Sequence, residues 1–234
     1  MLTAVLPAFF RRVPVTFHWS LVLLPVLLLA FDALGLRPFR GVGEEAIYLA
    51  LIFASILLHE LGHVVAAHAM GIRTQGVTLH LLGGAAKLAH QPQRPLQELA
   101  IVLAGPAVNV TIAVGLLALR FSGAIPSGSM ASELAIINLA IALFNMLPLF
   151  PLDGARALRA GLALVLGRLR ATTWAASGGV ILGTGLLLAS MHHAAPVIGL
   201  AAVLLALASY VEGKAALQLA SRSVEGDRQG TPHR

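Results

Sequence analysis

Two histidines and a glutamate lie within five residues of one another, and this spacing is typical of a metal site. His59 and His63 are four residues apart, and Glu60 directly follows the first histidine. Residues four apart share one face of a helix, so the two imidazoles can bind one metal ion. Glu60 then stands beside that face, where it can act as a base toward water at the metal. These residues indicate metal-dependent hydrolysis.

The segment that carries this motif is apolar and long enough to cross a bilayer. It runs from about residue 46 to residue 70, and about 20 apolar residues suffice for a membrane-spanning helix. An ionisable side chain there costs roughly 2.5 to 3.5 kcal/mol on insertion scales, so polar groups at membrane depth are typically functional. The alternative is a polar contact between helices, or a chance match to the motif.

Composition identifies the chain as an all-α membrane protein with several spans. Of its 234 residues, 58% are hydrophobic and 11% are charged, whereas about a quarter of the residues in soluble domains are charged. We expect about six transmembrane helices, with a short β-strand or hairpin between the second and third. The chain has no cysteine, so nitrogen and oxygen atoms must bind any metal. Its basic residues lie at span ends, which argues against nucleic acid as a partner.

The expected spans follow from the apolar runs and the breaks between them. A first span is expected over Val13–Leu34, after the basic pair Arg11-Arg12. The spans that would form the core cover about residues 45–70, 95–121 and 131–153, and two later spans cover about 172–191 and 194–213. We expect residues 1–234 to form a single transmembrane domain that ends in a polar tail over residues 214–234.

Residues 72–90 differ from the rest of the chain, because polar and apolar side chains mix there between glycines. The loose alternation over residues 75–81 predicts one or two short strands. Gly83 and Gly84 predict a bend or a close approach of another backbone. A strand edge beside a metal site could bind an extended peptide by strand addition, so this region is the candidate substrate-binding element. An ordinary amphipathic loop is the alternative.

Two prolines and a carboxylate mark the end of the fourth expected span. Pro148 and Pro151 break the helix, and Asp153 follows them. A carboxylate at membrane depth beside a broken helix is a functional candidate, so Asp153 is the expected third ligand of the metal. Two alternatives stay open at this point. Asp153 could only cap the helix that follows, and Glu98 could be the third ligand instead.

The basic residues also predict the topology. With the N-terminus inside, most Lys and Arg residues fall in cytoplasmic loops, so both termini are expected in the cytoplasm. The same topology puts the ends of the second and fourth spans on one side of the membrane. His59, His63 and Asp153 can therefore meet within the bilayer, nearer its cytoplasmic face.

Several motifs together resemble the site-2 protease family of intramembrane zinc metalloproteases, in its compact prokaryotic branch. They are His59-Glu60-Leu61-Gly62-His63, Ala104-Gly105-Pro106 with Asn109, Asn145 with Pro148 and Asp153-Gly154, Pro14-Val15 with His18-Trp19, and Gly83-Gly84. The resemblance covers about residues 10–160 in the family's order and spacing. We expect neither a PDZ domain within the chain nor a CBS domain after the sixth span.

The resemblance implies a role for each motif. His59, His63 and Asp153 would bind one zinc ion per chain, Glu60 would be the catalytic base, and Asn145 would help to position the substrate or its oxyanion. The implied activity is hydrolysis of peptide bonds within or near the transmembrane segment of single-pass membrane proteins. It would take place in the plasma membrane of a prokaryote, in contact with the lipid bilayer.

Two other classes of function stay open: a metal transporter that uses the same ligands, and an inactive relative that serves as a membrane scaffold. Transporters line their path with ionisable groups on successive spans, whereas the last two expected spans offer none. Glu60 argues against a scaffold, because zinc binding alone does not need its carboxylate. The sequence does not fix the physiological substrate or the oligomeric state.

Overall fold

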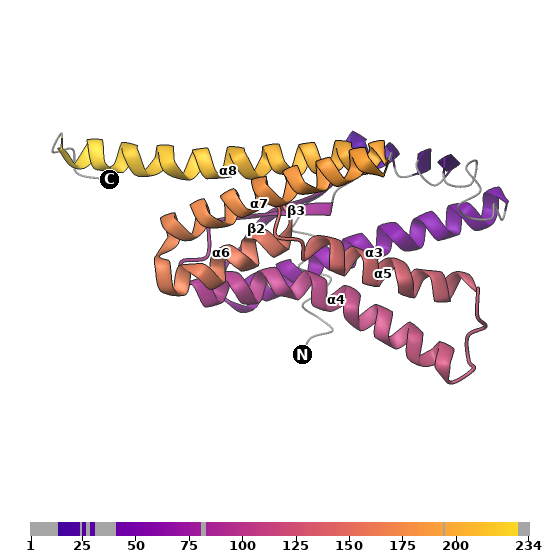
Figure 1. Cartoon of the computed structure of the whole chain (residues 1–234). Helices are drawn as coiled ribbons and strands as arrows, with labels where there is room; N and C mark the ends of the chain where they lie inside the picture. Colours follow the sequence, from indigo (N-terminus) through magenta and orange to yellow (C-terminus); the bar gives the residue numbers. More distant parts are fainter. Residues whose placement is uncertain are drawn as a thin grey trace. The chain divides into compact units, whose positions relative to one another are not determined.

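The structure is a computed structural model, and it describes residues 14–23, 25–26, 29–30, 41–80, 83–193 and 195–228. In chain order, the elements are β1 (Val15–Phe17), η1 (Trp19–Val22), α3 (Val42–Ala69), β2 (Thr74–His80), β3 (Gly83–Leu88), α4 (Pro95–Phe121), α5 (Met130–Asn145), α6 (Asp153–Leu166), α7 (Arg168–His192) and α8 (Pro196–Arg228). Figure 1 labels β2, β3 and the helices α3 to α8. The chain divides into two compact units. The first comprises Met1–Pro92 and Leu103–Leu143, and the second comprises Gln93–Val102 and Phe144–Arg234.

The part of the chain that the structure describes holds four helices long and apolar enough to cross a membrane, namely α3, α4, α7 and α8 as far as Arg222. A fifth apolar helix, α5, is shorter, at 16 residues. The expected helical membrane protein with several spans is therefore confirmed. The helix α4 begins at Pro95 as expected, because proline in the first turn lacks only an N–H that has no helical partner there.

The first expected span differs from what the structure contains. Val15–Phe17 is a strand and Trp19–Val22 is a 3-10 helix, so the described residues from Val15 to Val22 are not α-helical. Val15–Phe17 pair with β2, whereas Trp19–Val22 form the short 3-10 helix η1. Arg11-Arg12 and much of the remaining segment to Leu34 lie outside the described residues.

The first unit contains a three-stranded sheet in the order β1-β2-β3. β2 and β3 pair in antiparallel fashion, which confirms the hairpin expected between the second and third spans. β1 joins β2 in parallel, with Val15 opposite Val77. The Val77 N–H donates to the Pro14 carbonyl oxygen at 2.9 Å. The sheet therefore ties the beginning of the described chain to the hairpin.

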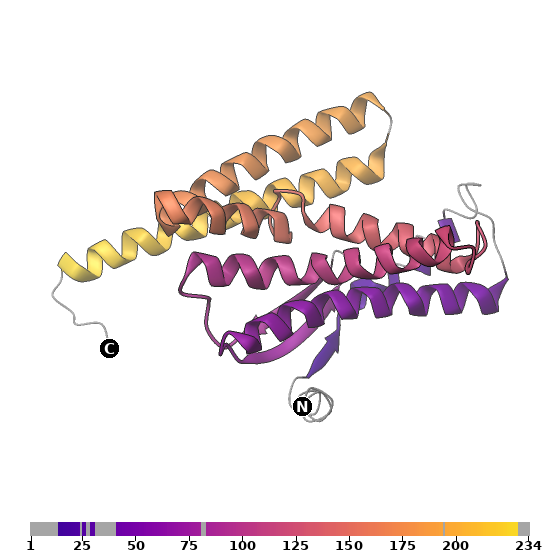
Figure 2. The same cartoon turned by 90° about the horizontal axis from the view of Figure 1, so that it is seen from below.

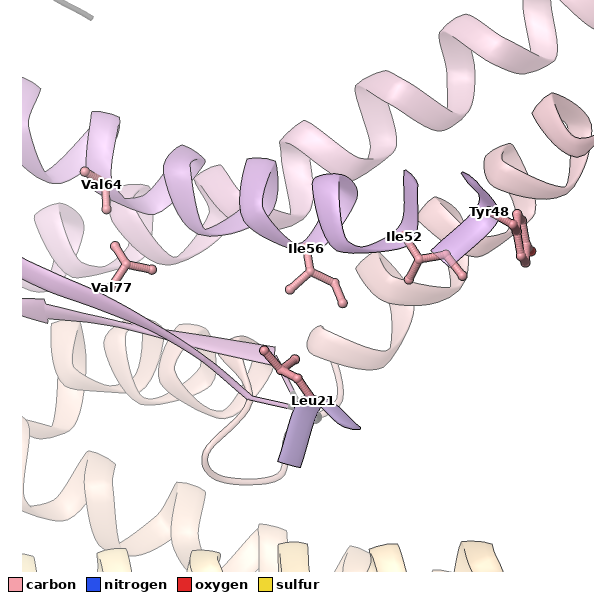
Figure 3. Close-up of a cluster of buried hydrophobic side chains, with 6 residues drawn as sticks. All are labelled: Leu21, Tyr48, Ile52, Ile56, Val64 and Val77. Carbon is pink, nitrogen blue, oxygen red and sulfur yellow. The ribbon is translucent and has the colours of Figure 1, made fainter. Parts of the chain in front are cut away.

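An apolar cluster joins α3 to this sheet (Figure 3). Its members on α3 lie four or eight residues apart, so they share one face of the helix. Ile137 and Ile141 of α5 pack against the same cluster, so α5 contributes to one core with α3 and the sheet. The buried members are Leu21, Tyr48, Ile52, Ile56, Val64 and Val77.

The helices α3 and α4 approach each other closely at Gly62. A Cβ on this glycine would lie within 3.0 Å of the backbone of Ala104, so a larger residue would push the helices apart. Small residues permit such close packing between membrane helices. Figure 2 shows α3 and α4 side by side in this region. This contact brings the Ala104-Gly105-Pro106 motif to the turn of α3 that carries the two histidines.

In the second unit, α7 and α8 pack as an antiparallel hairpin (Figure 2). Two glycines of α7 permit the close approach: a Cβ on Gly183 would meet Ala206, and one on Gly179 would meet Ser209, both within 3.0 Å. α8 continues to Arg228, so the polar tail expected from residue 214 begins as part of this helix.

Candidate metal centre

The two histidines of the motif lie on α3 with their Nε2 atoms 3.2 Å apart. Both side chains are buried, and their rings stand nearly at right angles, at 82°. Two nitrogen ligands of one tetrahedral zinc ion, each about 2.0 to 2.1 Å from the metal, stand roughly 3.3 to 3.4 Å apart. The spacing of His59 and His63 therefore fits two nitrogens that share one ion.

The other ring nitrogen of His59 has a partner on α4. His59 Nδ1 donates to Asn109 Oδ1 at a distance of 2.5 Å, and Asn109 is fully buried. Histidines that bind metals commonly donate their second ring N–H to a protein oxygen, which fixes the tautomer and the ring orientation. This bond leaves His59 Nε2 without a proton, as a metal ligand must be.

Gly105 brings the backbone of α4 directly against both imidazoles. A Cβ at this position would lie within 3.0 Å of Nε2 of His63 and of Nε2 of His59. Any side chain here would therefore occupy space that the ligand atoms need. This contact explains why a glycine stands in the Ala104-Gly105-Pro106 motif.

Glu60 is buried on the same helix, with 3% of its surface exposed. It follows His59 by one residue, which rotates it by about 100° around the helix axis. The carboxylate therefore lies beside the histidine face, as the sequence spacing predicts. An ionisable side chain is costly to place in an apolar membrane-spanning helix, so the position of Glu60 is typical of a functional site.

Asp153 belongs to the second unit, where it is the first residue of α6. The segment before it is buried and anchored, because the Phe150 N–H donates to Ser209 Oγ of α8 at 3.0 Å. Gly154 lies so close to the carbonyl of Met146 that a Cβ could not fit there. The chain reversal after the broken helix thus fixes where α6 begins and where Asp153 lies.

The interpretation of Asp153 as only a helix cap is not supported. The N-cap of α6 is Leu152, and no side chain forms a capping hydrogen bond there. Asp153 is 6% exposed, and its Oδ1 lies 3.4 Å from the Arg156 guanidinium. In the first turn, the positive end of the helix dipole favours a carboxylate. Asp153 is therefore a buried carboxylate that lies close to a guanidinium in the first turn of α6.

Glu98, the other candidate ligand, is engaged by arginines of its own unit. Arg159 donates to Glu98 Oε1 through Nε at 3.1 Å and through Nη2 at 2.5 Å, and Arg168 lies 3.4 Å from Oε2. Arg159 also donates to Glu212 at 3.0 Å and lies over the ring of Phe150. The carboxylate of Glu98 thus has a structural role that joins α4, α6, α7 and α8.

His59 and His63 are thus buried on α3 in the first unit, and Asp153 is buried at the start of α6 in the second. Asn145 ends α5 at the start of the segment that leads to Asp153, and it is 8% exposed. Gly83 begins β3, the edge strand opposite β1 in the sheet order.

Sequence reasoning missed one buried polar residue of this region. Asn138 lies in the middle of α5, has no exposed surface, and accepts a hydrogen bond from Asn109. A polar residue at the centre of an otherwise apolar helix was the available signal, because such residues need a partner in a membrane.

Parts of the chain are similar in sequence to known proteins. A family model described as peptidase family M50 matches residues 47–127, which include His59, Glu60 and His63. A zinc metalloprotease of Methanocaldococcus jannaschii is 33% identical over 178 residues, which are 75% of this chain and 50% of that protein. A Synechocystis protein is 41% identical over 111 residues, which are 47% of this chain and 29% of that protein. The chain spans half or less of the length of these curated relatives.

A solved structure has a similar fold. The site-2 protease from Methanocaldococcus jannaschii superposes with a TM-score of 0.66 and 29% sequence identity, over 86% of this chain and 91% of that chain. The likeness therefore extends well beyond the residues that the family model matches.

Proposed function

We propose that this chain is a member of peptidase family M50 and a zinc-dependent intramembrane endopeptidase of the site-2 protease type. The observation that carries the proposal is the convergence of His59 and His63, whose Nε2 atoms lie 3.2 Å apart in an apolar helix long enough to span a membrane. Polar groups are costly at such a depth, which favours a functional site over a packing contact.

His59, His63 and Asp153 are the proposed ligands of one zinc ion per chain. Two imidazoles and one carboxylate form a donor set suited to catalytic zinc, which keeps a fourth position open. All three side chains are buried. Zinc held there supplies a Lewis acid that makes water more acidic and polarises the carbonyl of a peptide bond.

Side chains of the protein carry out the proton transfers and stabilise the charge that develops during hydrolysis. Glu60 accepts a proton from the water that attacks the peptide carbon, and it then donates this proton to the amine nitrogen that leaves. A new C–O bond forms and the C–N bond breaks. Asn145 can donate from its side-chain amide to the carbonyl oxygen as negative charge develops on it.

The proposed substrates are single-pass membrane proteins, cleaved in the plasma membrane of a prokaryote. A transmembrane helix holds its peptide groups in hydrogen bonds between each N–H and the carbonyl four residues earlier, so it must unwind before hydrolysis. β3 is an edge strand, and an unwound segment can pair with such an edge through its main chain. Gly83 and Gly84 lack side chains that would obstruct this approach.

The test is cleavage of a single-pass model substrate by the purified protein in detergent, with the product ends mapped by mass spectrometry. Glu60→Gln removes the base, and Glu44→Gln is the control, because Glu44 is exposed on the same helix. We expect the wild type and Glu44→Gln to cut within the transmembrane segment, and Glu60→Gln to be inactive. Equal cleavage by Glu60→Gln would refute the role of Glu60. A folded, zinc-loaded wild type that cuts none of a broad substrate panel would favour the scaffold.

A further inference from the structure

Asn109, the partner of His59, is itself held by a buried side chain of α5. Asn109 Nδ2 donates to Asn138 Oδ1 at 2.8 Å, and it also lies 3.5 Å from the backbone carbonyl oxygen of Ser55. Neither asparagine has any exposed surface. The contacts of His59 therefore continue from α3 through α4 to α5, all within the first unit.

The orientation of Asn138 is fixed by groups of known hydrogen-bonding character. Its Nδ2 donates to the backbone carbonyl oxygen of Leu134 at 2.9 Å and to Ser55 Oγ at 3.0 Å. Ser55 Oγ in turn donates to the carbonyl oxygen of Leu51 at 3.0 Å. A backbone carbonyl can only accept a hydrogen bond, so the amide nitrogen of Asn138 must face Leu134. The Oδ1 atom of Asn138 must then face Asn109.

The same reasoning passes from Asn138 to the imidazole. Because Asn138 presents an oxygen, Asn109 must direct its amide nitrogen there and its Oδ1 toward His59. An oxygen at that position only accepts, so His59 must carry its proton on Nδ1. The second ring nitrogen, Nε2, is then free of a proton and faces Nε2 of His63 at 3.2 Å. A backbone carbonyl thus determines the tautomer of His59 through two asparagines.

We propose that Asn138 is a positioning residue for the metal site, which holds Asn109 in the orientation that keeps His59 protonated on Nδ1 and ready to bind metal through Nε2. This inference rests on the proposed zinc site. Without Asn138, the Asn109 amide nitrogen keeps only its longer contact, at 3.5 Å, with the Ser55 carbonyl oxygen. The amide can then turn its nitrogen toward His59, and in that orientation the imidazole carries its proton on Nε2. That tautomer cannot bind a metal through Nε2.

A purely structural role for Asn138 makes a different prediction, and one double variant separates the two. Asn138→Leu removes the group that orients Asn109. Asn109→Asp replaces the amide by a carboxylate, which offers an oxygen to His59 whichever way it turns. If Asn138 acts by orientation, Asn109→Asp restores the site in the Asn138→Leu background. If Asn138 only holds the helices together, the second substitution restores nothing.

The experiment measures zinc affinity by competition with a chelator, on the purified full chain in detergent. We expect Asn138→Leu to weaken zinc binding by about 10- to 100-fold, the usual effect of losing an outer partner of a metal ligand. The double variant should bind within a few-fold of the wild type. Thr172→Val is the control, because Thr172 is also buried but bonds only to its own helix at the Arg168 carbonyl oxygen. It should leave zinc affinity unchanged.

A second readout needs neither zinc nor activity. Nitrogen NMR of ¹⁵N-histidine-labelled, metal-free protein distinguishes a proton on Nδ1 from one on Nε2. We expect Nδ1 protonation of His59 in the wild type and a mixture of tautomers in Asn138→Leu. Wild-type zinc affinity in Asn138→Leu, a double variant as weak as Asn138→Leu, or an unchanged tautomer would overturn the proposal. A wild type that binds no zinc but shows the expected tautomers would refute the proposed zinc site instead.

Discussion

At the scale of single residues, the two histidines of the proposed zinc site could be singled out from the sequence, because their spacing is a local pattern. The spacing of His59 and His63 needs only a helix to place both imidazoles on one face. The role of Asn138 could not be predicted in the same way. It depends on contacts of Asn138 with residues of α4 and α3 that lie 29 and 83 positions away, and no local pattern encodes those contacts.

Gly105→Ala is the sharpest prediction at this scale. The added Cβ would lie within 3.0 Å of both ligand nitrogens, so the imidazoles must move from a geometry that suits one ion. We expect zinc affinity and cleavage to fall by at least tenfold, since displaced ligands lose metal. Gly115→Ala is the control on the same helix, because no atom lies within 4 Å of a Cβ there. Zinc content by mass spectrometry checks both variants, and equal zinc in both would contradict the packing argument.

At the scale of elements, the sequence predicted helices and strands that neighbouring residues determine. It did not predict a strand that forms only by pairing with a distant part of the chain. Proline marks the start of α4, and mixed polarity with glycines marks the β2–β3 hairpin, so both were predictable. β1 is three residues long and pairs with residues about 60 positions later, so its sequence alone resembles the start of a span. α8 extends to Arg228 because it continues a helix already stabilised by packing on α7.

Glu98→Gln tests how the elements of the second unit are held together. The side chains of Glu98 and Arg159 are 5% and 11% exposed, and the variant leaves Arg159 with a buried charge that is only partly compensated by Glu212. Breaking such a buried pair costs about 3 to 5 kcal/mol, so we expect a lower midpoint of thermal unfolding in detergent.

The same variant tests the choice of the third ligand. Because Glu98 is engaged by arginines, folded Glu98→Gln protein should keep its zinc at low temperature. Glu44→Gln, which changes an exposed carboxylate in the first turn of α3, should alter neither the unfolding midpoint nor the zinc content. Loss of zinc from folded Glu98→Gln protein would instead support Glu98 as the third zinc ligand.

At the scale of the whole molecule, the membrane-spanning character followed from composition, because four helices of the described chain are long and apolar enough to cross a bilayer. The asymmetry of Lys and Arg adds a prediction about orientation, with both termini in the cytoplasm. The absence of cysteine makes this simple to test, since any single cysteine introduced will be the only thiol in the chain.

Cysteine labelling in intact cells tests this topology. Ser127 is exposed between α4 and α5, and Ser221 is exposed near the end of α8. Because the distribution of basic residues puts these positions on opposite sides, a membrane-impermeant thiol reagent should label Ser127→Cys in intact cells. It should label Ser221→Cys only after the membrane is opened. The reverse pattern would mean that the basic residues misidentify the cytoplasmic side.

The central claim is that zinc and Glu60 act together in hydrolysis, and the most direct measurement pairs bound zinc with cleavage in the same preparations. Wild type and Glu60→Gln are purified, assayed for zinc per chain, and incubated with a single-pass substrate before and after chelation. We expect about one zinc per chain in both proteins. We also expect cleavage by the wild type alone, lost on chelation and regained when zinc is restored. Folded wild type without zinc, or cleavage that survives complete removal of the metal, would contradict this claim.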